Sequence, residues 1–158
     1  MTKAKRDRFI QDRIRALATV ILTRRPDVNI VETKESTGLD FHIYVERDDR
    51  SMRQAFGVLL RGVPSPVTLD HANRVLGPTM GFFNGLGKFT YPVCVFFFTM
   101  QDDGAYFSWL AEPVVSQQGP KLVHRTGADC AELTDARLDG VIEQVVSWYD
   151  AFELAVIG

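Results

Sequence analysis

Residues 92–110 read PVCVFFFTMQDDGAYFSWL, and this stretch decides the fold class. The run from Pro92 to Met100 is almost continuously apolar and rich in Val and Phe, which is typical of a central strand buried on both faces. Residues 102–104, Asp-Asp-Gly, predict a tight turn into a second strand from Ala105 to Leu110. We therefore expect a hairpin at the centre of a sheet.

Three more strands are predicted upstream of this hairpin, over residues 27–35, 39–46 and 55–63. In residues 39–46 apolar and polar side chains alternate strictly, so this strand has one apolar and one polar face. Downstream, residues 119–124 predict a short edge strand.

Helices are expected at both ends of the chain and once between the strands. From Lys5 to Leu22 the apolar residues recur with the period of a helix that has one buried side; they are Ile10, Ile14, Leu17 and Ile21. A short helix follows Thr68 as far as Leu76, residues 77–88 form an irregular loop, and Thr134 opens a C-terminal helix. The sequence thus predicts a single α/β domain over residues 1–158, with a mixed central sheet flanked by helices.

Composition restricts the class of protein. The chain has 158 residues, of which 46% are hydrophobic and 24% charged, as expected for one globular domain with a sizeable core. Its two cysteines form no Cys-x-x-Cys pair, which argues against a disulfide-stapled or zinc-nucleated domain. No apolar run is long enough for a membrane span, so we expect a cytoplasmic protein with no membrane partner.

Charge is distributed unevenly, although the net charge is only -2. Residues 1–25 contain eight Lys or Arg, whereas residues 127–158 contain seven acids and Arg137 as the sole basic residue. A localised basic block can bind nucleic acid or an acidic partner, and Arg8 and Arg15 are expected to share its solvent-facing ridge. A solvated helix surface is the alternative interpretation.

Asp40 begins the alternating strand, on its polar face. If that strand pairs with residues 55–63, Asp40 shares a face with Leu59 and Arg61. Metal-dependent nucleases hold Mg²⁺ with an acid at the start of one strand, and with an acid and a Lys two residues apart on its neighbour. We expect Asp40 and Arg61 to lie within ion-pair reach, with Leu59 beside them.

Three segments carry a family resemblance: ESTGLDFHIYVE (35–46), AFGVLLRGV (55–63) and YPVCVFFFTMQDDGAYFSWLAEPV (91–114). In this order they resemble an uncharacterised family of restriction-endonuclease-like domains of the PD-(D/E)XK superfamily, over roughly residues 5–115. The resemblance implies that Asp40 matches the metal-binding Asp, that Leu59 replaces the second metal ligand and that Arg61 replaces the Lys. Two of the three positions therefore depart from the family pattern.

Three functions are compatible with these features. The first is a nuclease-like domain whose two departures from the family pattern leave it without catalysis or cofactor. It binds nucleic acid through Arg8, Arg15 and Arg61, or binds a partner, and the resemblance implies a bacterial defence or mobile-element context. The first alternative is an active Mg²⁺-dependent nuclease rebuilt from Asp40 and Glu32, for which His42 is a weaker candidate base. The second is a protein-interaction module that uses the Phe82-Phe83 loop or the acidic C-terminal end, and self-association into a homo-oligomer stays open.

Overall fold

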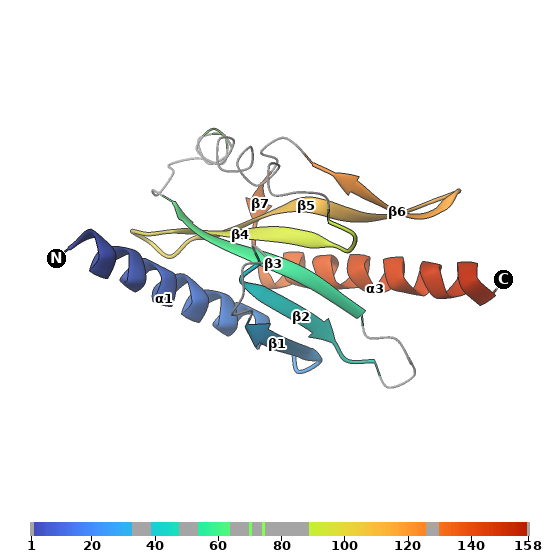
Figure 1. Ribbon diagram of the computed structural model, residues 1–158, viewed down its shortest axis with the longest axis horizontal. Helices are drawn as coiled ribbons and strands as arrows, with labels where there is room; N and C mark the ends of the chain where they lie inside the picture. Colours follow the sequence, from blue (N-terminus) through green and yellow to red (C-terminus); the bar gives the residue numbers. More distant parts are fainter. Residues whose placement is uncertain are drawn as a thin grey trace.

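The structure is a computed structural model that describes residues 2–32, 39–47, 54–63, 70, 74, 89–125 and 130–157 (Figure 1). Its elements, in chain order, are α1 (Lys3–Leu22), β1 (Val28–Glu32), β2 (Phe41–Val45), β3 (Gln54–Val63), β4 (Val93–Thr99), β5 (Ala105–Ser116), β6 (Gly119–His124), β7 (Ala131–Glu132) and α3 (Asp135–Ile157). None of the helices in these ranges is both long and apolar enough to cross a membrane.

The strands form one mixed sheet of seven strands. The order is β1-β2-β3-β4-β5-β6, and β7 pairs with the first half of β5. Neighbouring strands are antiparallel except β3 and β4, which are parallel and therefore need a crossover connection, supplied by residues 64–92. The prediction of a single α/β domain with a mixed sheet and helices is confirmed at this level.

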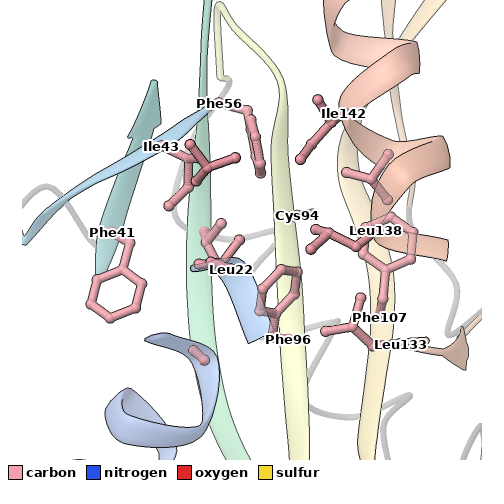
Figure 2. Packing of buried hydrophobic residues seen from close by; sticks show 14 of the residues in the cluster. Leu22, Phe41, Ile43, Phe56, Cys94, Phe96, Phe107, Leu133, Leu138 and Ile142 are labelled. Atoms are coloured by element: carbon pink, nitrogen blue, oxygen red, sulfur yellow. The ribbon is translucent and has the colours of Figure 1, made fainter. Parts of the chain in front are cut away.

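Both described helices pack on the same face of the sheet, where they enclose the larger core (Figure 2). The predicted apolar side of α1 is confirmed: Ile14 is fully buried, while Ile10, Leu17 and Ile21 are partly buried. The buried residues that the helices contribute are Ile14, Ala18, Leu22, Leu138, Val141, Ile142 and Val145. The buried residues that the sheet contributes to this core include Phe41, Ile43, Phe56, Cys94, Phe96 and Phe107.

The opposite face of the sheet carries a second buried cluster, which includes Leu59, Val95 and Phe97. Strand β4 contributes side chains to both clusters, and all seven of its residues are buried. The prediction of a central strand buried on both faces is thus confirmed.

Two features of the sheet differ from the expectation. Strand β5 does not end at Leu110 but continues to Ser116, because its second half pairs with β6 in a hairpin whose turn is closed by Gly119 at φ 109°. Strand β7 was not predicted, since two residues are too short for a periodic signal. The helix expected over residues 68–76 and the loop with Phe82 and Phe83 lie outside the described residues, apart from helical positions 70 and 74.

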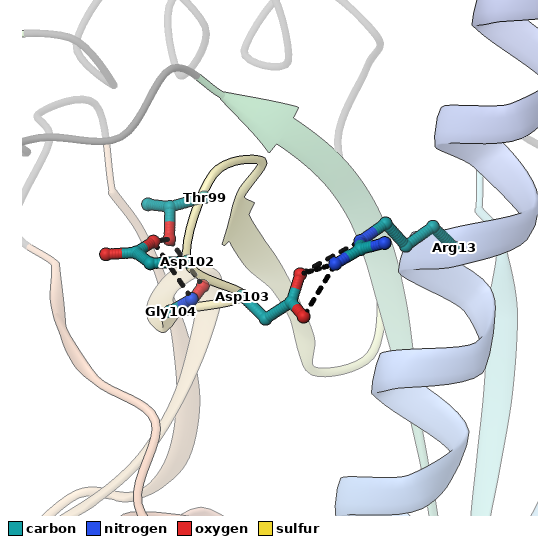
Figure 3. Close-up of polar contacts among 5 residues, drawn as sticks. All are labelled: Arg13, Thr99, Asp102, Asp103 and Gly104. Atoms are coloured by element: carbon teal, nitrogen blue, oxygen red, sulfur yellow. Dashed lines mark hydrogen bonds and ion pairs between the residues drawn. The ribbon is translucent and has the colours of Figure 1, made fainter.

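Ion pairs connect α1 to distant parts of the chain. Arg13 donates to both carboxylate oxygens of Asp103, in the β4–β5 turn, at 2.6–2.9 Å (Figure 3). Nη1 of Arg24 lies 2.6 Å from Asp135 at the start of α3. Arg25 pairs with Asp27, and its hydrogen bond lowers the pKa of that carboxyl.

Arg25 also pairs with Asp139 on α3, at 2.6 Å. Together with the Arg24–Asp135 pair, this contact means that part of the basic N-terminal block is neutralised by part of the acidic C-terminal block. The uneven charge distribution of the sequence is therefore partly an intramolecular arrangement.

Candidate functional site

Asp40 lies directly before β2, beside strand β3, and its side chain is only 16% exposed. Its Oδ2 accepts a hydrogen bond of 2.8 Å from the backbone N–H of Leu60. Its own backbone N–H donates to the carbonyl of Val58 at 3.0 Å. The carboxylate thus extends the pairing of β2 and β3 by one side-chain hydrogen bond.

Arg15 reaches this carboxylate from α1. Its Nη2 lies 3.4 Å from Oδ1 of Asp40, and its Nη1 lies 3.6 Å from Oε1 of Glu32 at the end of β1. The guanidinium also lies 5.7 Å from the centroid of the Phe41 ring, within the range of a cation–π contact. The half-buried Arg15 therefore lies between Asp40 and Glu32, the two carboxylates that were expected as candidate metal ligands.

The expected pair of Asp40 and Arg61 is wrong. Leu39 packs in the second cluster and Phe41 in the first, so these two side chains point to opposite faces of the sheet. The alternation of apolar and polar side chains, expected from residue 39, therefore starts only at residue 41. Asp40 is instead directed to Leu60 N–H and Arg15. Arg61 lies on the same face of β3 as Leu59, opposite to the Asp40 contacts, and its Nη1 donates to the Leu60 carbonyl at 2.9 Å.

His42 does not join Asp40 either. It alternates with Phe41 and Ile43, which point to the helix-covered face, so it lies on the other face of β2. There its ring stacks on Tyr91, with 5.9 Å between the centroids and 20° between the planes. Burial, with a smaller contribution from Tyr44, raises the pKa of Tyr91. The contacts of His42 are those of a packing residue.

The first two turns of α1 carry the basic residues of the N-terminal block that are exposed and have no ion-pair partner among the described residues. Arg8 is exposed as predicted, but Arg15 is half-buried and ion-paired, so the two do not form a solvent-facing ridge. The exposed basic residues of these turns are Lys3, Lys5, Arg6 and Arg8. Within the described ranges they have no ion-pair partner, and the neighbouring Phe9 is 57% exposed.

This concentration of positive charge is not explained by helix stability. The first turn of α1 contains no acidic residue, and cations near a helix N-terminus are disfavoured by the helix dipole, typically by about 0.3–1 kcal/mol each. Because the four basic side chains are exposed and outnumber the one acid among them, Asp7, this end of the helix is accessible to an external anion.

Sequence reasoning missed a cavity of about 740 Å³ between β5, β7 and α3. Arg125 and Glu112, which pair at 3.1 Å, contribute to its lining, together with Gly140 of α3. A Cβ at Gly140 would meet nothing within 4 Å. In the sequence, the feature that points to this cavity is Gly140, a glycine inside the expected C-terminal helix.

The two cysteines are reduced and buried. Cys94 lies in the larger core, where burial raises the pKa of its thiol well above the usual value, and this makes the thiol a poor nucleophile. Cys130 contributes to the wall of the cavity. Among the residues that the structure describes, no three His, Cys, Asp or Glu side chains gather in a way that could hold a metal ion.

No family model, no curated protein and no solved structure matches this chain.

We expect Arg15 and Asp40 to be energetically coupled. Arg15→Met keeps an apolar stem over Phe41 but removes the charge, and Asp40→Asn keeps an oxygen for the Leu60 N–H. A double-mutant cycle by urea unfolding should give a coupling free energy of about 0.5–1 kcal/mol, as for a partly exposed ion pair. The matched cycle of Arg61→Met with Asp40→Asn should give none. Coupling to Arg61 in place of Arg15 would contradict the geometry.

Gly140→Ala should stabilise the protein. The added methyl group meets no neighbour, and replacing a helix-interior glycine by alanine raises the free energy of unfolding by about 0.5–1 kcal/mol. Gly62→Ala is the control, because its Cβ would come within 3.0 Å of Ile10 and Met100 and should yield no gain. A loss of stability in Gly140→Ala, measured by urea unfolding, would show that the space beside α3 is not open.

Proposed function

We propose that this chain is a restriction-endonuclease-like domain that no longer cleaves and that acts by binding nucleic acid. One observation carries the proposal: the Arg15 guanidinium stands between the carboxylates of Asp40 and Glu32. These two acids are the candidate metal ligands, and a fixed cation of the protein already compensates their charge.

The arrangement of β2 and β3 agrees with the resemblance in one respect, the position of the acid, and departs from it in the face on which Arg61 lies. The resemblance implies an acid at the start of one strand and the second ligand on its neighbour, and Asp40 indeed accepts a hydrogen bond from β3 at Leu60. Leu59, at the position of the second ligand, is fully buried in an apolar cluster. A buried leucine offers no oxygen to a hard cation, which prefers carboxylates, carbonyls and water.

Arg61 also departs from what cleavage requires. A Lys at this position presents a compact ammonium to a water or a phosphate, whereas the guanidinium of Arg is a broad planar group. In this chain Arg61 lies on the face opposite to the Asp40 contacts. The acid and the cation that must converge on one phosphate are therefore on different faces of the sheet.

Binding is supported by the exposed charges at the start of α1. Lys3, Lys5, Arg6 and Arg8 lie within two helical turns, and their charge suits a phosphate backbone. Contacts of this kind give affinity without sequence preference. A cytoplasmic role in bacterial defence or in mobile-element biology is part of this proposal, on the resemblance alone.

We expect no cleavage of plasmid, single-stranded DNA or RNA in Mg²⁺ or Mn²⁺, because one acid beside a fixed Arg positions a hydrated divalent cation poorly. Gel assays at high protein concentration test this expectation. Metal-dependent nicking by the wild type that is lost in Asp40→Ala, but kept in Arg61→Met, would instead support a nuclease rebuilt from Asp40 and Glu32.

Nucleic-acid binding should depend on the start of α1. Arg6→Glu/Arg8→Glu should weaken binding to duplexes of different sequence to the same degree and reduce the slope of log K against log salt by about 1–2. The matched control is Lys121→Glu/Arg137→Glu, which makes the same change in net charge at two other exposed positions. Binding is measured by a fluorescence anisotropy titration. An equal loss of affinity in both variants would show that net charge, and not the start of α1, determines binding.

A further inference from the structure

The first two turns of α1 bury none of their side chains. Every residue from position 2 to position 9 is exposed, Ile10 is the first to pack partly against the core, and Ile14 is the first that is fully buried. In Figure 1 this end of α1 extends beyond the strands of the sheet. These two turns are therefore free of packing duties and accessible to another molecule.

One apolar ring lies among the cations of these turns. Phe9 is 57% exposed. Lys5 and Arg6 precede it by four and three positions, so all three side chains lie on the same side of the helix. Within the described ranges neither cation has an ion-pair partner. An exposed aromatic ring and two available positive charges thus share one surface.

The other border of the ring is different. Arg13 follows Phe9 by four positions, but it donates to both carboxylate oxygens of Asp103 at 2.6–2.9 Å, and this pair fixes α1 against the β4–β5 turn (Figure 3). Asp12 follows Phe9 by three positions and is exposed. Positive charge is therefore available beside the ring only towards Lys5 and Arg6, and a phosphate is expected there.

A second exposed apolar residue of α1 shows that this combination is particular to Phe9. Val20 is also 57% exposed. The basic residue within one turn of it is Arg24, whose guanidinium pairs with Asp135 at 2.6 Å. Among the described residues of α1, an exposed ring beside available cations thus occurs at Phe9. It suits a ligand that combines phosphates with flat apolar faces.

The two forms of nucleic acid differ in what they offer to this ring. In a duplex the bases stack on one another, and a protein contacts phosphates and the base edges in the grooves. In a single strand the base faces are free to stack on aromatic side chains, and the contact tolerates any base. A lipid surface fits less well, because an interfacial helix inserts a broad apolar side, and that of α1 is packed in the core.

We propose that the start of α1 binds single-stranded nucleic acid, with the ring of Phe9 stacked on a base and with Lys5 and Arg6 at neighbouring phosphates. This inference rests on the proposed nucleic-acid binding and names the form that is bound. Strands of DNA and of RNA share both chemical groups, so either is accepted.

The test compares affinities for single strands and for a duplex by fluorescence anisotropy. The probes are labelled oligothymidylate, oligouridylate and a duplex, each about 12 nucleotides long. Phe9→Ala should weaken binding to both single strands about tenfold, because the stacking surface is lost. The affinity for the duplex should change less than about twofold, because the phosphate contacts are kept.

Val20→Ala is the matched control, since it removes an equally exposed apolar side chain from the same helix and should leave the affinities for both forms unchanged. Both positions are exposed, so thermal unfolding should show an intact fold in both variants.

Phe9→Trp gives a direct readout of stacking. The indole keeps an aromatic surface, so the affinity for oligothymidylate should be retained, and stacking on a base should quench the fluorescence of the new side chain. Trp109 and Trp148 are buried and provide a constant background.

Three results would overturn this inference: wild-type affinity of Phe9→Ala for single strands, an equal loss for single strands and duplex, or no quenching of Phe9→Trp when oligothymidylate is bound. The proposed nucleic-acid binding would stand in each case if Arg6→Glu/Arg8→Glu still weakens binding. A wild type that binds neither form would overturn the proposed function as well. If it then binds vesicles of anionic phospholipid, and Phe9→Ala does not, the surface belongs to a membrane contact.

Discussion

Strand β4 can form only if both of its faces are covered, because every residue from Val93 to Thr99 is buried. The rest of the architecture follows from this requirement. Strands β3 and β5 pair with its two edges, the two described helices cover one face, and the second cluster buries the other. The strand that carries Leu59 and Arg61 is therefore next to the least accessible strand of the molecule, and Leu59 is buried with it.

The elements could be predicted from the sequence because their periodicity is local. The stretch around Phe96 specifies a buried strand, and the spacing of Ile10 and Ile14 specifies a helix. The site could not be predicted in the same way. Whether Asp40 points to Arg61 or to Arg15 depends on where the alternation of β2 starts, and Leu39, two positions before that start, packs in the second cluster. A shift of two residues in the start of the alternation thus changed the partner of the acid.

The ion pairs between the two ends of the chain could not be predicted from the sequence either. The sequence shows a basic beginning and an acidic end, but not that Arg24 and Arg25 reach Asp135 and Asp139 across the fold. Only the structure separates the arginines that hold α1 in place from the basic residues that face solvent. The two groups are equal in size, with four residues each, and the proposed phosphate-binding surface consists of the second group alone.

The pair of Arg25 with Asp139 joins residues 114 positions apart, and the larger core likewise contains side chains of both α1 and α3. Contacts this distant in sequence delay folding, because most of the chain must be in place before they form. On a translating ribosome, α1 emerges long before the helix that completes its core. Its apolar side then has no native cover, and such nascent chains are the ones that chaperones protect from aggregation.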